Sequence, residues 1–230
     1  MNLLRVENIS SGYGKKEIIK DITFEINEGE IVTLAGSNGA GKSTVLKTIY
    51  GINEVWNDGK IYFLDEDITG LSSEEMLKKG IVYIGQKNNT FDALTVKENL
   101  ETAGYLYDKE ILKEKIETIL ESFEMLKTKL DKKPQQLSGG QKQLLALAMG
   151  LIHEPKIILF DEPSAGLDVK TMNFIFGIIQ TLKEKNGISF LIVEHKVKEI
   201  DKISDTFLGL RLGLLEKETN KLEVLKSVFI

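Results

Sequence analysis

The chain has 230 residues, of which 42% are apolar and 28% charged, and its net charge is -5. These values suit one globular unit with a sizeable core, and the acidic balance disfavours non-specific nucleic-acid binding as the main role. The absence of cysteine excludes disulfides and thiolate chemistry, which is natural for a cytosolic protein. No apolar run approaches the roughly 20 residues that span a bilayer. No long apolar stretch follows Met1, so we expect neither a membrane span nor a signal peptide.

The first third of the chain alternates between short apolar runs and turns. Four apolar runs have the length and the flanking turn residues of strands. A glycine-rich loop follows the third run, and a helix is predicted from Ser43 to Tyr50, where Gly51 closes it. The predicted strands are Leu3–Val6, Ile22–Ile26, Ile31–Leu34 and Ile81–Ile84.

The rest of the chain first becomes helical and then alternates between strand and helix. Apolar residues recur at helical spacing from Val96 to about Lys129, Pro134 ends this pattern, and another helix is predicted to start within residues 137–141. Two fully apolar strands, Ile157–Phe160 and Phe190–Val193, flank a helical stripe. Such alternation implies an α/β fold with a mainly parallel sheet covered on both faces. The stripe comprises Met172, Ile175, Phe176, Ile179 and Leu182, and Gly187 follows it.

The glycine-rich loop has the pattern of a phosphate-binding loop. Its glycines let the backbone bend around a phosphate chain, and the following helix points free N–H groups at the anion. Lys42 adds a charge for the β- and γ-phosphates, and the Ser43 hydroxyl is a magnesium ligand. The pattern follows a predicted strand and opens a predicted helix, which disfavours a chance glycine turn. The loop comprises Gly36, Ser37, Asn38, Gly39, Ala40, Gly41, Lys42, Ser43 and Thr44.

Two carboxylates, Asp161 and Glu162, end one of the apolar strands. A buried strand that ends in two acids beside a phosphate loop suits a metal ligand and a base. Asp161 would hold magnesium through water, and Glu162 would polarise the attacking water. The alternative is a pair of solvated acids at a strand end.

Residues Leu137–Gln141 have the sequence LSGGQ at the predicted start of a helix. Ser138, with the N–H groups of Gly139 and Gly140, can cap a phosphate by the helix dipole, although an ordinary N-cap is the plain alternative. With the phosphate loop and the Asp-Glu strand, this segment makes the chain resemble the ATPase subunit of an ABC transporter, from about Leu3 to Asp205. The resemblance implies that Ser138, Gly139, Gly140 and Gln141 reach the γ-phosphate bound to the opposite subunit. Two subunits, identical or sister chains, would then sandwich two ATP in a head-to-tail dimer.

The resemblance also assigns roles to four single residues. Gln86 is similar to the glutamine that touches magnesium and the attacking water and joins the core to a helical insert. His195 is similar to the switch histidine that contacts the γ-phosphate, and Tyr13 to the aromatic residue that stacks on adenine. Asp168 belongs to a segment, 163–168, that resembles the family's dimer-contact loop. Without the resemblance, Gln86 would be a polar loop residue and Tyr13 an exposed tyrosine in a glycine turn.

The implied architecture is a P-loop α/β core with a mainly parallel sheet, an N-terminal antiparallel β subdomain and a helical insert. We expect residues 1–87 and 153–230 to form the ATP-binding core, and residues 88–152 to form the helical subdomain that carries LSGGQ. Two segments depart from the family. The helix after the signature, Lys142–Gly150, lacks the arginines that are frequent there, and the tail after Asp205 only weakly resembles the usual glycine-turn hairpin and short helix, with Gly209 and Gly213.

The implied function is hydrolysis of ATP with Mg²⁺, coupled to transport. The partners would be the second ATPase subunit, transmembrane permease subunits and an extracytoplasmic solute-binding protein, with no nucleic acid. The protein would lie in the cytoplasm, peripheral on the inner face of the membrane through the permease. In the segment after Gln86, Phe91 and Leu94 would contact a permease coupling helix, unless Phe91 packs inside the insert.

The transported substrate is indicated only by loop features. Residues 67–71, 88–100 and 193–195 resemble those of the ATPases of branched-chain amino-acid importers. The alternatives are an ABC exporter ATPase and a soluble ABC ATPase that acts on nucleic acid or ribosomes. The latter usually carries two ATPase units or a long insertion, and neither is found here. A P-loop switch without turnover is disfavoured by Glu162. The sequence leaves open the substrate and the direction of transport.

Overall fold

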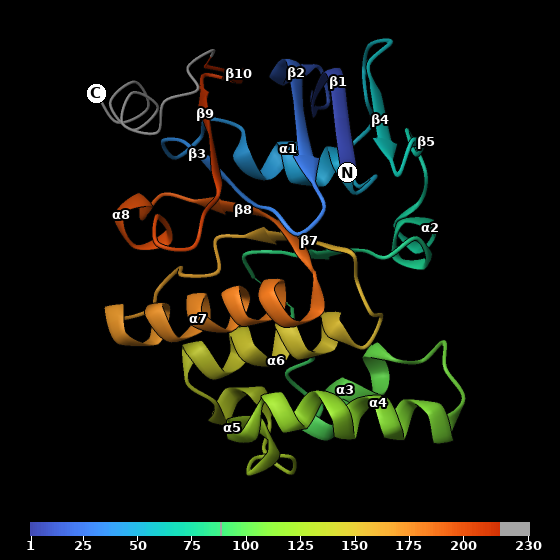
Figure 1. Ribbon diagram of the computed structural model, residues 1–230, viewed down its shortest axis with the longest axis vertical. Coiled ribbons are helices and arrows are strands. Elements are labelled where there is room, and N and C mark those ends of the chain that lie inside the picture. The colour runs from blue at the N-terminus through green and yellow to red at the C-terminus, as the bar shows by residue number, and fades with distance from the viewer. Residues whose placement is uncertain (88, 217–230) are drawn as a thin grey trace.

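A six-stranded sheet forms the centre of the molecule (Figure 1). The computed structural model describes residues 1–87 and 89–216, so Asn88 and the predicted tail segment 217–230 lie outside the described residues. The strands β9, β3, β8, β7 and β6 are parallel neighbours in that order, and β10 pairs antiparallel with β9 at the edge. Their bounds are β3 Ile31–Ala35, β6 Ile81–Ile84, β7 Ile157–Asp161, β8 Ser189–Glu194, β9 Thr206–Arg211 and β10 Leu214–Leu215.

This sheet is buried on both faces, which explains why its central strands are continuously apolar. In β7, Ile158 and Phe160 belong to one core and Ile157 and Leu159 to the other. The alternation follows from side chains pointing to opposite faces along a strand. One core also contains residues of helices α6 (Gly139–Leu151) and α7 (Val169–Asn186), and the other contains residues of α1 (Lys42–Ile49) and the antiparallel strands. The predicted α/β fold with a mainly parallel sheet is therefore confirmed.

A separate antiparallel sheet has the strand order β2-β1-β4-β5 and lies at one end of the molecule (Figure 1). Its first two strands are far longer than the short runs predicted from the sequence. Strand β1 shifts register against β2 at several points, for example between Val6 and Ile9. Such bulges break the alternation by which a strand is recognised. The bounds are β1 Asn2–Tyr13, β2 Lys16–Asn27, β4 Lys60–Phe63 and β5 Glu66–Asp67.

Helices α3, α4 and α5 lie at the other end of the molecule, and α6 and α7 lie between them and the central sheet (Figure 1). The apolar pattern predicted from Val96 to about Lys129 is divided, because α3 ends before Gly104. A Cβ on Gly104 would come 2.1 Å from Leu112 Cδ1, so the chain turns in close contact with α4. The helices are α1 Lys42–Ile49, α2 Ser73–Lys78, α3 Val96–Ala103, α4 Lys109–Ser122, α5 Glu124–Lys127, α6 Gly139–Leu151, α7 Val169–Asn186 and α8 Val197–Ile200, with a 3₁₀ turn at Pro134–Gln136.

The described part of the tail, which resembles the family only weakly in sequence, contains a glycine-turn hairpin. Gly213 has φ 81 between β9 and β10, and its carbonyl oxygen accepts a hydrogen bond from Lys20 N at 2.9 Å. The hairpin is thereby attached to β2. Among the described residues, no helix has the length and apolar character needed to cross a membrane.

Candidate active site

The phosphate loop connects β3 to α1 and leaves the start of that helix open. Gly39 and Gly41 have φ 81 and φ 106, values that favour glycine. A Cβ on Gly41 would also lie 2.8 Å from Ile19 Cγ2. No side chain caps the N-terminus of α1, and its first turn contains no acidic residue. The free N–H groups and the helix dipole therefore form a site for an anion.

Lys42 lies over this loop with 5% of its surface exposed. Its Nζ donates hydrogen bonds to Gly36 O at 2.8 Å and Ser37 O at 3.0 Å. Burial lowers the pKa of Lys42, and the nearby carboxylates of Glu162, Asp161 and Glu194 oppose that shift. The two carbonyl contacts hold the ammonium group at the loop, close to where phosphates would bind.

Ser43 and Asp161, both predicted as metal ligands, are in direct contact. Ser43 Oγ donates a hydrogen bond to Asp161 Oδ1 at 3.0 Å, and the aspartate is 3% exposed. Burial raises the pKa of Asp161, and the neighbouring charge of Glu162 raises it further. Burial and the charge of Glu162 thus both disfavour the ionised carboxylate of Asp161. Mg²⁺ binds oxygen ligands such as this carboxylate and the Ser43 hydroxyl, and it would neutralise the negative charge of Asp161.

Glu162, Gln86 and His195 come together from the ends of three neighbouring strands. Glu162 follows β7 with φ 51, a left-handed conformation that is costly for a residue with a side chain and is concentrated at functional sites. Its Oε2 accepts a hydrogen bond from Gln86 Nε2 at 2.5 Å, and its Oε1 lies 3.9 Å from His195 Nδ1. His195 Nδ1 is buried and has no hydrogen-bond partner. Gln86 contacts the predicted base, and the described residues show no hydrogen bond from it to Asp161.

Tyr13 ends β1 and exposes 49% of its surface. The Nζ atom of Lys47, from α1, lies 6.0 Å from the centroid of its ring. The ring thus stands beside the helix that follows the phosphate loop, where it can stack on a nucleotide base.

The LSGGQ turn starts α6, and Ser138 is the N-cap of that helix. Its Oγ accepts from Gln141 N at 3.3 Å, and Ser138 N donates to Gln141 Oε1 at 3.0 Å. The plain N-cap alternative is therefore realised within the single chain. A Cβ on Gly140 would come 2.2 Å from Thr171 Cγ2, and one on Gly139 would come 3.0 Å from Leu167 Cδ2. The turn packs closely against the start of α7.

Asp168 is exposed and caps the N-terminus of α7. Its Oδ1 accepts from Thr171 N at 3.0 Å and its Oδ2 from Thr171 Oγ1 at 2.7 Å, and these hydrogen bonds lower its pKa. The carboxylate predicted to contact a second subunit is thus already bound to its own helix.

Sequence reasoning assigned no role to two side chains at the site. Tyr83, in β6, donates its hydroxyl hydrogen bond to Asp161 Oδ2 at 3.4 Å. Glu194, the last residue of β8, is fully buried beside His195. A polar residue within or at the end of an otherwise apolar strand was the available signal in both cases.

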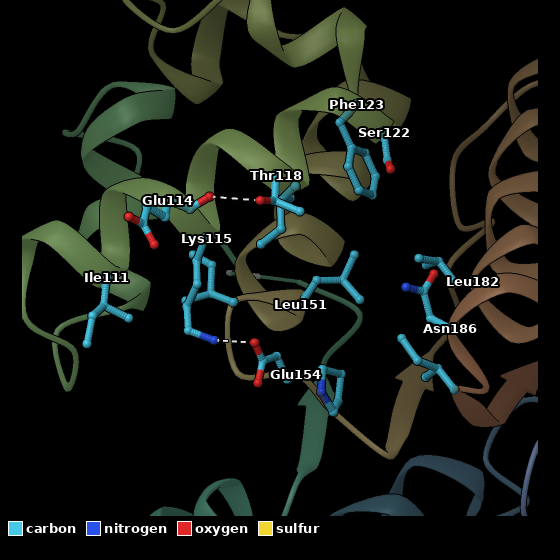
Figure 2. A pocket seen from close by; sticks show the side chains of 14 residues that line it. Ile111, Glu114, Lys115, Thr118, Ser122, Phe123, Leu151, Glu154, Leu182 and Asn186 are labelled. Atoms are coloured by element: carbon cyan, nitrogen blue, oxygen red, sulfur yellow. Dashed lines mark hydrogen bonds and ion pairs between the residues drawn. The ribbon is translucent and has the colours of Figure 1, made fainter.

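A cavity of about 690 Å³ lies away from these residues, between α4, the end of α6 and α7 (Figure 2). Figure 2 shows Leu151 and Leu182 at its wall and the ion pair of Lys115 with Glu154. Pro155, which also lines it, precedes β7, so the cavity is at the N-terminal ends of the parallel strands. Ligands of open α/β sheets bind at the carboxyl ends, where the phosphate loop is. The cavity is therefore separate from the candidate active site.

Known proteins are similar to this chain in both sequence and fold. The family model described as "ABC transporter" matches residues 19–165. The high-affinity branched-chain amino acid transport ATP-binding protein BraG of Pseudomonas aeruginosa is 36% identical over 211 residues, covering 92% of this chain and 90% of that protein. The probable branched-chain amino acid transport ATP-binding protein LivF of Archaeoglobus fulgidus is 36% identical over 203 residues, covering 88% and 86%.

Solved structures give the same result. A nucleotide-free ATP-binding cassette from an ABC transporter superposes with a TM-score of 0.88 at 31% identity, covering 99% of this chain and 95% of that one. A dimeric ATP-binding cassette bound to ADP and phosphate superposes with a TM-score of 0.81 at 28% identity, covering 94% and 97%. The phosphate loop, the buried Asp161 and the LSGGQ turn are thus found in a chain that belongs to the ABC transporter family, as an ATP-binding subunit whose ATPase activity is coupled to transport.

Proposed function

We propose that two copies of this chain, or this chain and a sister chain, hydrolyse MgATP in a head-to-tail dimer that drives import of branched-chain amino acids. The proposed substrate class rests on the similarity to BraG and LivF over nearly the full length of those proteins. A methionine importer subunit of Clostridioides difficile is 34% identical, but only 63% of its length is covered. The loop features at residues 67–71, 88–100 and 193–195 support the same substrate class.

Within one subunit, the phosphate loop and Lys42 bind the phosphate chain. Ser43 and Asp161 hold Mg²⁺, and when bound it neutralises the charge on the phosphate oxygens. Glu162 orients the attacking water and accepts its proton at the carboxylate, at a point where Gln86 and His195 flank it. Tyr13 stacks on the adenine.

The second subunit completes the site. Its LSGGQ turn presents the start of α6, where Ser138 is the N-cap, to the γ-phosphate, and its dimer-contact loop supplies Asp168. The N-cap hydrogen bond of Ser138 supports this role, because a hydroxyl that is already fixed at a helix start is preorganised for an anion. Closure on ATP and reopening after hydrolysis would then move the permease between its two states.

The proposed permease contact is the loop after Gln86. Phe91 is 51% exposed, which favours docking over packing inside the insert, and Leu94 is half-buried. The buried Asn99 holds the loop, because its Oδ1 accepts from Phe91 N at 2.7 Å and its Nδ2 donates to Phe91 O and Leu94 O. This loop opens the helical subdomain proposed at 88–152, between the core segments 1–87 and 153–230. The chain would lie in the cytoplasm on the inner face of the membrane, below a permease that receives substrate from a solute-binding protein.

The test is uptake by cells that lack the gene for this chain and carry it on a plasmid. We expect uptake of radiolabelled leucine and isoleucine to be lost in the deletion strain and restored by the parent, but not by Glu162→Gln. Methionine and spermidine uptake serve as controls. Unchanged leucine uptake with a loss of methionine or spermidine uptake would reject the proposed substrate. Loss of efflux without any uptake defect would favour an exporter.

A further inference from the structure

Two loops that the proposed function treats separately are joined by charged side chains. The first is the dimer-contact loop, residues 163–168, between β7 and α7. The second is the switch segment, Glu194–Lys196, which begins at the last residue of β8 and ends before α8. Residues Glu194 and Lys196, on either side of His195, each bind the dimer-contact loop.

Glu194 bridges the two loops through its two carboxylate oxygens. Its Oε1 accepts a hydrogen bond from Ser164 N at 2.9 Å, in the dimer-contact loop. Its Oε2 accepts from His195 N at 3.1 Å and Lys196 N at 3.3 Å, in the switch segment. The side chain has no exposed surface. A buried carboxylate is costly unless such donors satisfy it, so these three N–H groups and the acid hold one another in place.

Lys196 makes the reciprocal contacts with the same loop. Its Nζ donates to Ser164 O at 3.2 Å and to Leu167 O at 3.3 Å. Ser164 is therefore bound at its N–H by one side chain and at its carbonyl oxygen by the other. Leu167 also lies against the LSGGQ turn, since a Cβ on Gly139 would come 3.0 Å from it.

His195 stands between these two attachments, with its Nδ1 atom 3.9 Å from Glu162 Oε1. We propose that Glu194 and Lys196 are positioning residues that couple the dimer-contact loop to His195. When a second subunit presses on that loop, the two side chains carry the displacement to the backbone of His195 and set its ring against Glu162 and the γ-phosphate. The inference rests on the roles proposed above for the dimer and for His195.

Three variants test the coupling. In Glu194→Gln the amide has one oxygen, so it can accept from Ser164 N or from the switch segment but not from both. In Lys196→Met the two carbonyl contacts are lost and Glu194 is untouched. Lys198→Met is the matched control, because Lys198 is exposed on α8, two residues further along.

We expect kcat for ATP to fall about 10- to 100-fold in Glu194→Gln and in Lys196→Met, as misplacement of a reacting group does. The KM for ATP should stay within about twofold, because Lys42 and the phosphate loop are unchanged. The double variant should be no slower than the slower single variant, since either break uncouples the loops. Lys198→Met should have the parental rate. If Glu194→Gln does not fold, the kcat and KM of Lys196→Met decide the question.

ATP-dependent dimer formation, measured by light scattering in the Glu162→Gln background, separates coupling from simple damage. We expect the dimer to form with and without Glu194→Gln. Parental kcat in Glu194→Gln and Lys196→Met would overturn the inference, and so would loss of the dimer only when Glu194 is replaced. Absence of the dimer in Glu162→Gln itself would instead refute the proposed sandwich, on which the inference depends.

Discussion

Glu162→Gln is the change that tests the proposed hydrolysis most directly. Gln has the shape of Glu, and its side-chain oxygen can still accept the hydrogen bond from Gln86 Nε2. The backbone hydrogen bond from residue 162 N to Val193 O is also unaffected. The fold should therefore persist, and ATP binding with it. The removed charge also lies beside the buried Asp161, whose pKa it raises. In Glu162→Gln the carboxyl group of Asp161 should therefore ionise more readily and stay competent to bind magnesium.

The expected loss of ATP turnover is the loss caused by removing a general base. Such a group contributes about 10²- to 10⁴-fold in rate, which corresponds to about 3 to 5 kcal/mol of transition-state stabilisation. The affinity for ATP should change by less than about threefold, because Lys42 and the amides of the phosphate loop carry the binding. The ATP-bound dimer should accumulate, since it forms but does not hydrolyse its nucleotide.

The chain contains a matched control at the other end of the same strand. Glu154 precedes β7, also has φ 51, and forms an exposed ion pair with Lys115. Glu154→Gln removes a carboxylate from the same backbone conformation, at a cost of about 1 kcal/mol or less, and should leave turnover unchanged. Phosphate release gives the rates, and gel filtration with ATP gives the dimer. Turnover in Glu162→Gln at close to the parental rate, or an equal loss in Glu154→Gln, would refute the assignment of the base.

Three further predictions concern the second subunit, the permease and the metal site. Ser138→Arg should cost about 1 kcal/mol of stability through the lost N-cap and abolish the ATP-dependent dimer, while ATP affinity of the monomer stays nearly parental; a large loss of monomer affinity would place LSGGQ beside the chain's own nucleotide. Phe91→Asp should leave the melting temperature and the ATPase rate of the isolated chain nearly unchanged but abolish co-purification with membranes; a lower melting temperature with intact membrane association would show that Phe91 packs inside the insert. Asp161→Asn should abolish turnover yet raise the melting temperature without nucleotide at neutral pH. The folded-state pKa of Asp161 is raised, so the parent loses stability as pH rises from the ordinary carboxyl range through that pKa. The gain in melting temperature in Asp161→Asn should therefore vanish in acid. A gain in melting temperature that grows in acid would contradict this reasoning.

The phosphate loop could be predicted from the sequence because its parts are contiguous. Strand, glycine turn and helix succeed one another within residues 31–49, and each is recognised by local rules: apolar run, positive-φ glycines, helix periodicity. The same holds for the end of β7 at Asp161 and for the α7 stripe that ends at Gly187, which has φ 68. Local patterns failed where the backbone is irregular, as in the bulged β1 and at Asp21 in β2, which has φ 50.

The sequence by itself thus determined the α/β class, the phosphate loop, the acidic strand end and the start of α6 at LSGGQ. Apart from the family resemblance, only the tertiary structure decided that Gln86, Glu162 and His195 meet. They follow β6, β7 and β8, and the order in which strands pair depends on long-range packing. It also decided the surroundings of Glu194. An acid at the end of an apolar strand has the same local pattern whether it is solvated or buried. Only the fold brings Ser164 N to within 2.9 Å of it and makes that carboxylate a link between two loops.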